Sequence, residues 1–312
     1  MHALEEAPKG IAGVAHRVVH GGPEFRDPVV LDDGVERQLA ALTELAPLHN
    51  APALAAIHRA RTQLPDVPHV AVFDTAFHAT IPAEAATYAL PARVRNDWGI
   101  RRFGFHGLSV QWASEQVPVP RLVVCHLGGG CSVTAVRDGR SVDTTMGFTP
   151  LEGVPMATRP GSVDPGALLY LLRHHLTLDD LDRMLEHESG LAGLSGLSGD
   201  VKELEDADEP AAELALRVFA YRVATAIGAR AVSLDGIDAL VFTAGIGEHS
   251  ARVRAAVCAR LDFLGVELDP AANEAAEPDA TLSLDGASPR VIVLHAREDI
   301  VAARAARALL FQ

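Results

Sequence analysis

The stretch RLVVCHLGGGCSVTAVRDGR, residues 121–140, decides the fold. Residues 122–125 predict a short buried strand, and residues 132–136 predict a second strand that ends at an Asp138-Gly139 turn. Three consecutive glycines, residues 128–130, lie between the two strands. Because glycine has no Cβ, such a turn lets backbone N–H groups approach a ligand closely and cradle phosphate oxygens. A mobile hairpin loop is the alternative that the glycines alone allow.

Strand and helix patterns alternate along the rest of the chain, which predicts an α/β fold with largely parallel sheets and some antiparallel hairpins. The segments expected to lack regular structure are 45–52, 101–109, the long apolar stretch 143–166, and 190–199, which is either a flexible connector or a loop at a nucleotide. We expect strands at 14–20, 69–73, 237–242 and 290–294, and helices at 32–45, 53–64, 167–174, 177–187, 211–234, 250–261 and 300–311.

Composition excludes several functional classes. The 312 residues are enough for two domains, since single cores stop growing near ~250–300 residues. A net charge of −14 argues against nucleic-acid binding, which requires a basic face. There is no signal-peptide pattern at the start and no apolar run long enough for a membrane span. Cys125, Cys131 and Cys258 lack paired spacing, so we expect a cytoplasmic protein with neither disulfides nor a zinc site.

Polar residues stand at strand ends, where ligand sites gather in open α/β sheets. Asp74 follows the strand at 69–73 directly and is either a functional carboxylate or a cap for the next turn. Arg17 lies in the strand at 14–20, as part of a solvated edge or as a cation directed into a cleft. His106 lies between Gly104 and Gly107, and this setting favours a functional role over the structural role that an isolated histidine usually has. The Gly245-x-Gly247 sequence lies between a strand and a helix, where a nucleotide phosphate is favoured.

Several short sequence motifs follow one another in the order that is typical of a single protein family. They are HRVVHGG (16–22), LAPLHN (45–50), FDTAFH (73–78), GFHG (104–107), 146–153 with Thr158-Arg159, and GIGE (245–248). From about Ala15 to Glu298, the chain resembles the acetate kinase family. That resemblance implies two ribonuclease-H-like lobes of the actin-like ATPase superfamily. It also implies reversible transfer of the γ-phosphoryl of ATP to acetate, with Mg²⁺, in a homodimer that binds no nucleic acid or membrane. Propionate is an alternative substrate, since one methylene is worth only ~1–3 kcal/mol in an apolar pocket.

The resemblance also implies roles for individual residues. Asp74, His106 and Arg159 would be catalytic, and His106 would donate to the transferred phosphoryl group while Asp74 orients substrate or Mg²⁺. Arg17 would bind the substrate carboxylate, while Glu298 would be the carboxylate linked to Mg²⁺ through water. The pocket for the acyl methyl group would be formed by Val19, Leu48 and Pro150. The implied nucleotide-binding residues are His126, Leu127, Gly128, Gly129, Gly130, Asp200, Val201, Lys202, Gly245, Ile246, Gly247, Glu248 and His249.

The sequence also departs from that family. Members begin with a segment close to NAGSSSLK, which is absent here, so we expect the first lobe to be incomplete. Residues 1–74 with 299–312 would be the remnant of the N-terminal acyl-substrate lobe, and residues 75–298 the C-terminal nucleotide-binding lobe. Either the reading frame starts upstream of Met1, or the chain is a catalytically impaired nucleotide-binding protein or fragment. Gly129 stands where the family has Asn, and Lys202 where it has Arg, which keeps the charge but loses bidentate geometry.

Overall fold

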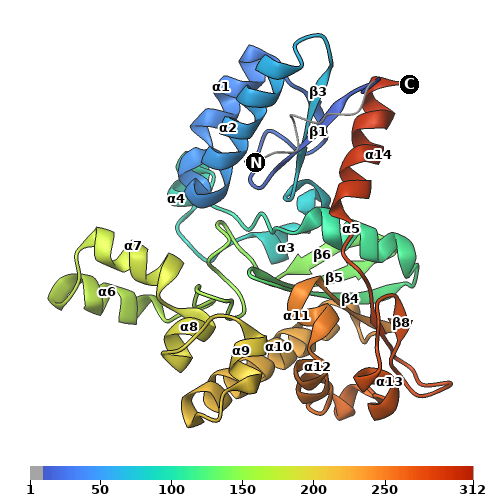
Figure 1. The fold of residues 1–312 in the computed structure, drawn as a ribbon. Coiled ribbons are helices and arrows are strands. Elements are labelled where there is room, and N and C mark those ends of the chain that lie inside the picture. Colours follow the sequence, from blue (N-terminus) through green and yellow to red (C-terminus); the bar gives the residue numbers. More distant parts are fainter. Residues whose placement is uncertain (1–9, 312) are drawn as a thin grey trace.

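The computed structural model describes residues 10–311, and within them the strands form two sheets (Figure 1). The first sheet has the order β1-β3-β2 and consists of β1 (Val14–Val18), β2 (Val29–Val30) and β3 (His69–Phe73). The second has the order β6-β5-β4-β7-β9-β8. Its strands are β4 (Arg121–Leu127), β5 (Cys131–Arg137), β6 (Arg140–Thr144), β7 (Ala239–Thr243), β8 (Ala280–Thr281) and β9 (Arg290–Val293).

Helices surround both sheets, and no described helix is both long and apolar enough to cross a membrane. The helices are α1 (Asp33–Ala41), α2 (Pro47–Gln63), α3 (Ala83–Ala86), α4 (Ala92–Trp98), α5 (Gly107–Gln116), α6 (Pro165–His174), α7 (Leu178–His187), α8 (Gly190–Ser195), α9 (Val201–Asp206), α10 (Pro210–Leu234), α11 (Ala244–His249), α12 (Ala251–Cys258), α13 (Pro270–Glu274) and α14 (Glu298–Leu310). Short 3₁₀ turns are η1 (Thr43–Leu45), η2 (Ala76–Thr80) and η3 (Asp262–Leu264).

The central strand of the first sheet is β3, which is buried along its whole length. Such a strand needs a continuous apolar run, because both of its faces are covered. Its alternate side chains belong to different clusters: Phe73 shares one with Leu39 of α1, and Val72 shares another with Val301 of α14. Parallel pairing of β1 with β3 places Arg17 opposite Val72, close to the carboxyl end of β3.

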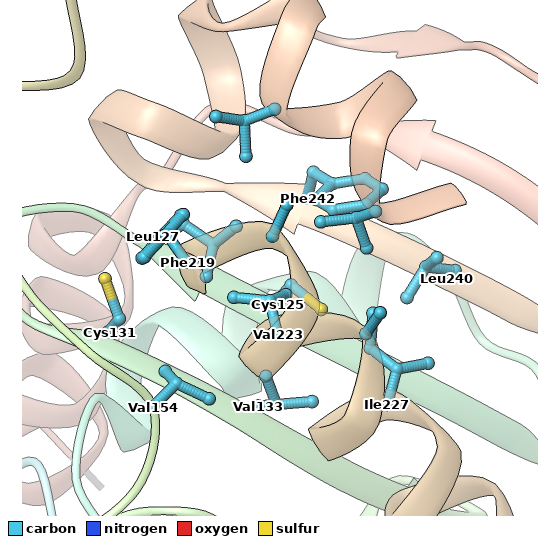
Figure 2. Packing of buried hydrophobic residues seen from close by; sticks show 14 of the residues in the cluster. Cys125, Leu127, Cys131, Val133, Val154, Phe219, Val223, Ile227, Leu240 and Phe242 are labelled. Atoms are coloured by element: carbon cyan, nitrogen blue, oxygen red, sulfur yellow. The ribbon is translucent and has the colours of Figure 1, made fainter. Parts of the chain in front are cut away.

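The largest core lies between the second sheet and α10. Phe219, Val223 and Ile227 recur every four residues and therefore share one face of the helix. Figure 2 shows these three side chains among Cys125 of β4 and Phe242 of β7. The expected strands around the glycine turn are confirmed, since β4 and β5 pair antiparallel from Arg121↔Arg137 to Leu127↔Cys131. The parallel pairs β4–β7 and β7–β9 confirm the mixed α/β sheet.

Four segments expected to be loops contain regular structure. Residues 45–52 are largely helical, because α2 begins at Pro47 and carries Pro52 inside it. A tertiary contact holds this first turn: the Asn50 side chain accepts from His20 N (3.0 Å) and donates to His20 O (3.1 Å). Tertiary contacts of this kind override weak local propensity. The helix α5 starts inside the expected 101–109 loop, β6 takes the beginning of 143–166, and α8 takes half of 190–199.

We propose that residues 1–74 with 299–312 form one lobe and residues 75–298 the other. Packing supports this division, because α14 lies against β1 and β3 of the first sheet (Figure 1). The helix α5 connects the two units. Its Leu108 belongs to the α14 cluster, and its Val110 and Ala113 belong to a cluster with β4 and β7.

Candidate active site

Three charged residues meet at the carboxyl end of β3. Arg17 donates from Nε to Asp74 Oδ1 (2.8 Å), from Nη2 to Asp74 Oδ2 (2.7 Å), and from Nη1 to Glu298 Oε2 (2.8 Å). Burial lowers the pKa of Arg17, but the pairs with Asp74 and Glu298 outweigh burial and raise that pKa overall. With both carboxylates ionised, this cluster carries a formal charge of −1, which favours a cation beside it.

Glu298 has one unused oxygen. Its Oε1 is buried and has no hydrogen-bond partner among the described residues, while Oε2 binds Arg17. Burial raises the pKa of this carboxyl group, and Arg17 opposes that rise. Leaving a buried carboxylate oxygen unpartnered is costly, so this atom fits a cation or an ordered water. Residues 10–311 contain no group of three or more His, Cys, Asp or Glu close enough to form a metal cage.

Arg159 is a buried cation that no carboxylate of the described residues contacts. Its side chain is 9% exposed, and Nη1 donates to Pro150 O (2.9 Å). Within the described part of the chain it forms no ion pair, and burial lowers its pKa, although the Glu186 carboxylate opposes that shift. An unpaired buried charge destabilises the empty protein unless an anion compensates it. We therefore interpret Arg159 as the anion-binding group of the site.

The segment that carries Arg159 is fixed by its backbone and by the start of α8. Met156 N donates to Arg159 O (2.9 Å), closing a tight turn. Backbone N–H groups of Ser189, Leu191 and Ala192 then donate to the carbonyls of residues 158, 156 and 157, at 2.8–2.9 Å. The first N–H groups of a helix have no partners inside it, so here they hold the loop that carries Arg159. Both alternatives for 190–199, a flexible connector and a loop at a nucleotide, are therefore wrong for its first half, which is a short helix that packs on this segment.

His106 is placed by an unusual backbone conformation. It is the N-cap of α5 with φ of 60°, and Gly107 N donates to Asp74 O (2.8 Å), which keeps the histidine beside the β3 end. Burial lowers the pKa of His106 well below its usual value, and His126, Arg17, Arg159 and His78 lower it further. The ring is consequently neutral near pH 7.

A cavity of about 330 Å³ unites most of the predicted catalytic and acyl-substrate residues. Glu298 is not part of its lining, but it binds Arg17, which is. The side chain of Leu48 lies outside the described part of the structure, although its backbone forms the first turn of α2. The lining residues are Arg17, Val19, His49, Pro52, Ala53, Asp74, Phe105, His106, Gly130, Pro150 and Arg159.

Sequence reasoning missed four of those lining residues: His49, Pro52, Ala53 and Phe105. The first three are spaced i, i+3, i+4, which places them on one face of α2. Helical spacing has no meaning in a loop, and the sequence predicts a loop at 45–52. Phe105 is fully buried beside His106, and neither it nor Phe103 belongs to a periodic pattern that would mark it in the sequence.

A larger cavity of about 890 Å³ lies on the other side of the glycine turn. Its volume suits a ligand of nucleotide size. Ala157 N donates to Gly129 O (3.3 Å), so the turn and the Arg159 segment are linked where the two cavities approach each other. The predicted nucleotide-binding residues that line it are Gly128, Gly129, Asp200, Val201, Lys202, Gly245, Ile246 and His249.

The remaining predicted nucleotide-binding residues lie elsewhere. Gly130 lines the smaller cavity, and Leu127 is fully buried in the main core. His126 is buried behind His106, with the two rings stacked at 4.0 Å between centroids. Gly247 lies within α11 and is buried.

Glu248 is a buried structural carboxylate. Its Oε1 accepts from Ala244 N and Ala296 N (2.9 Å each), and His295 Nδ1 lies 2.6 Å from Oε2. It therefore ties α11 to the segment that leads into α14 and Glu298. Its side chain is absent from the lining of either cavity.

The chain has an α/β fold of the actin-like ATPase class, with a nucleotide-sized cavity and a smaller one that approach each other at a glycine turn. The model of the Acetokinase family matches residues 1–304. An acetate kinase from Synechococcus sp. is 50% identical over 311 residues, covering 96% of this chain and 77% of that protein. The chain belongs to the acetokinase family.

Two solved structures share the fold. A propionate kinase from Francisella tularensis matches with a TM-score of 0.91 and 35% identity, covering 96% of this chain and 79% of that one. The acetate kinase of Porphyromonas gingivalis matches with a TM-score of 0.90 and 35% identity, covering 99% of this chain and 80% of that one.

Proposed function

We propose that this protein transfers the γ-phosphoryl group of ATP reversibly to acetate, giving acetyl phosphate and ADP. The observation that carries the proposal is Arg159, a buried guanidinium without a carboxylate partner where the two cavities approach each other. The names of its relatives support the choice of substrates. The larger cavity would hold the nucleotide and the smaller one the acyl substrate.

The chemistry needs positioning and charge neutralisation more than covalent help. An acetate oxygen forms a bond to the γ-phosphorus while the bond from that phosphorus to the β–γ bridging oxygen breaks. Acetate is already ionised at neutral pH, so no general base is required. Asp74 therefore serves to hold Arg17, which presents its remaining N–H groups to the carboxylate. Arg159 and the neutral imidazole of His106 flank Gly130, where they can donate to the transferred group.

Mg²⁺ fits the carboxylates at this end of the site. The unpartnered Oε1 of Glu298 and the negative Arg17–Asp74–Glu298 cluster are suited to a hydrated divalent cation. When bound with the nucleotide, the ion would neutralise phosphate charge. Glu298 would hold it through water, because the described residues offer too few ligands for a direct protein cage.

Acetyl phosphate formation tests the proposal directly. We expect purified protein with ATP, Mg²⁺ and acetate to give hydroxamate when hydroxylamine traps the acyl phosphate. Binding of a fluorescent ADP analogue is measured in parallel. Nucleotide binding without turnover would contradict the proposed reaction and favour the catalytically impaired alternative. Propionate is compared through kcat/KM, because one methylene changes this ratio by only about 10- to 200-fold.

Compartment and assembly are further parts of the proposal. Three buried free cysteines suit a reducing cytoplasm. A homodimer is supported by α6, which has no buried residue although Leu169 is 48% and Tyr170 56% exposed. The helices α6 and α7 project from the body of the molecule in Figure 1. Light scattering, which measures the molar mass in solution, tests this assembly.

Gly130→Ala is expected to lower kcat, whereas Gly228→Ala, on α10 and outside the lining of both cavities, is expected to leave it nearly unchanged. A Cβ at residue 130 would lie 3.0 Å from Arg159 Nη2 and 3.1 Å from His106 Nε2. At residue 228 a Cβ would meet only Phe263 Cζ, at an ordinary contact distance of 3.8 Å. We expect a loss of about 10-fold or more for the first variant, since small displacements of positioned groups cost rate steeply. Equal kcat values for the two variants would remove Gly130 from the reacting region.

A further inference from the structure

Two histidine–serine pairs connect the start of α5 with the β4–β5 hairpin. His106 Nδ1 lies 3.0 Å from Ser132 Oγ, and His126 Nδ1 lies 2.8 Å from Ser109 Oγ. His106 and Ser109 belong to the first turn of α5, while His126 and Ser132 are directly opposed in the hairpin. Each element therefore contributes one histidine and one serine, and the two rings stack at 4.0 Å between centroids.

The direction of the His106–Ser132 bond follows from hydrogen-bond accounting. Ser132 is fully buried, and its hydroxyl has no other partner among the described residues. If Nδ1 carried the proton, the Ser132 hydroxyl hydrogen would have no acceptor, which is costly in a buried position. The satisfied arrangement has the hydroxyl donating to Nδ1, so the imidazole proton is on Nε2.

Nε2 faces the reacting region. It is the His106 atom closest to the position that a Cβ on Gly130 would take, at 3.1 Å, with Arg159 Nη2 at 3.0 Å from the same point. In the other tautomer, Nε2 would present a lone pair to an incoming phosphoryl oxygen. The position of one proton therefore decides whether the ring attracts or repels the transferred group.

We propose that Ser132 is a positioning residue that keeps the proton of His106 on Nε2. The Ser109–His126 pair fixes the plane of the ring on which His106 stacks. This inference rests on the proposed phosphoryl transfer for its effect on rate, but the tautomer itself is measurable in the resting protein.

Nitrogen NMR of ¹⁵N-histidine-labelled protein at pH 7.5 tests the inference, with His106→Gln identifying the His106 signals. We expect a protonated Nε2 and an unprotonated Nδ1 in the unmodified chain. Ser132→Ala should increase the Nδ1-protonated population. It should also lower kcat about 10-fold while the KM values for ATP and acetate change less than about 2-fold, as for loss of one buried hydrogen bond. Ser132→Thr, which keeps the hydroxyl, should restore most of the Nε2-protonated population and most of kcat.

Ser114→Ala is the matched control. It removes a hydroxyl from α5, the helix that begins at His106. Among the described residues that hydroxyl bonds only to Gln111 O (2.8 Å), so the tautomer and kcat should be unchanged. A protonated Nδ1 in the unmodified chain would overturn the inference without any activity measurement. So would a Ser132→Ala variant with unaltered tautomer and kcat. Absence of turnover in the unmodified chain, with Nε2 protonated, would contradict the proposed function and leave the tautomer assignment standing.

Discussion

Arg159→Ala is expected to lower kcat for acetyl phosphate formation by about 10³-fold, which corresponds to about 4 kcal/mol of transition-state stabilisation. The reason is that Arg159 is a buried cation that forms no ion pair among the described residues, so the transferring phosphoryl group would be its partner. Arg17, by contrast, already binds two carboxylates. The measurement is steady-state kinetics with saturating ATP and acetate.

The fold should survive this substitution. Removing an unpaired buried charge relieves a desolvation cost, so the Tm of the ligand-free variant should change by only about 4 °C or less, equivalent to about 1–2 kcal/mol. Arg159→Lys keeps the charge but loses the planar fork, and should give an intermediate rate. Arg304→Ala removes an exposed arginine that pairs with Glu115 and should behave as the unmodified protein. Full activity in Arg159→Ala would contradict the role assigned to this residue.

Much of the fold could be predicted from local patterns, because buried strands and helical spacing are written directly in the sequence. The hairpin at 121–137 is the clearest case: its glycine turn and flanking apolar runs gave both strands, and the family match confirms the resemblance. The individual site residues remain predictions. Their convergence in two cavities is consistent with the proposed roles.

The features of the site that could not be predicted from the sequence depend on contacts between distant segments. Every residue of β4 from Leu122 to Leu127 is buried, so no alternation shows which face His126 takes. Its position behind His106 follows from the α5 start, which is set by the bond from Gly107 N to Asp74 O. Likewise the GIGE block suggested a ligand role for Glu248, whereas the structure gives its side chain three partners within the protein.

Residues 190–199, which are rich in Gly, Leu and Ser, are a second case in which distant contacts decide the structure. They also lead to the second prediction with a large expected effect. The sequence left open a flexible connector or a loop at a nucleotide, yet Gly190 lies against the backbone of the Arg159 segment. A Cβ there would lie 2.2 Å from Met156 O, 2.8 Å from Arg159 O and 2.9 Å from Arg159 N. Its φ of 60° is also in the left-handed region that favours glycine. Two separate physical constraints therefore require glycine at this position.

Gly190→Ala is accordingly expected to destabilise the protein by about 2–4 kcal/mol, combining left-handed strain of ~1 kcal/mol with overpacking of about 1–3 kcal/mol. It should also lower kcat at least about 10-fold, since the alanine methyl would displace the turn that positions Arg159. Urea unfolding at pH 7.5 measures the first effect and steady-state kinetics the second.

Gly196→Ala separates the two constraints, because Gly196 closes the same helix with φ of 66° and a Cβ there would meet nothing within 4 Å. This control should lose only the strain of ~1 kcal/mol and keep its kcat. The difference between the variants therefore measures how far the close approach at Gly190 holds Arg159 in place. If both variants lose the same stability and keep full kcat, the α8 start does not position Arg159, and the rigidity of that arginine must come from its own turn through the Met156–Arg159 bond.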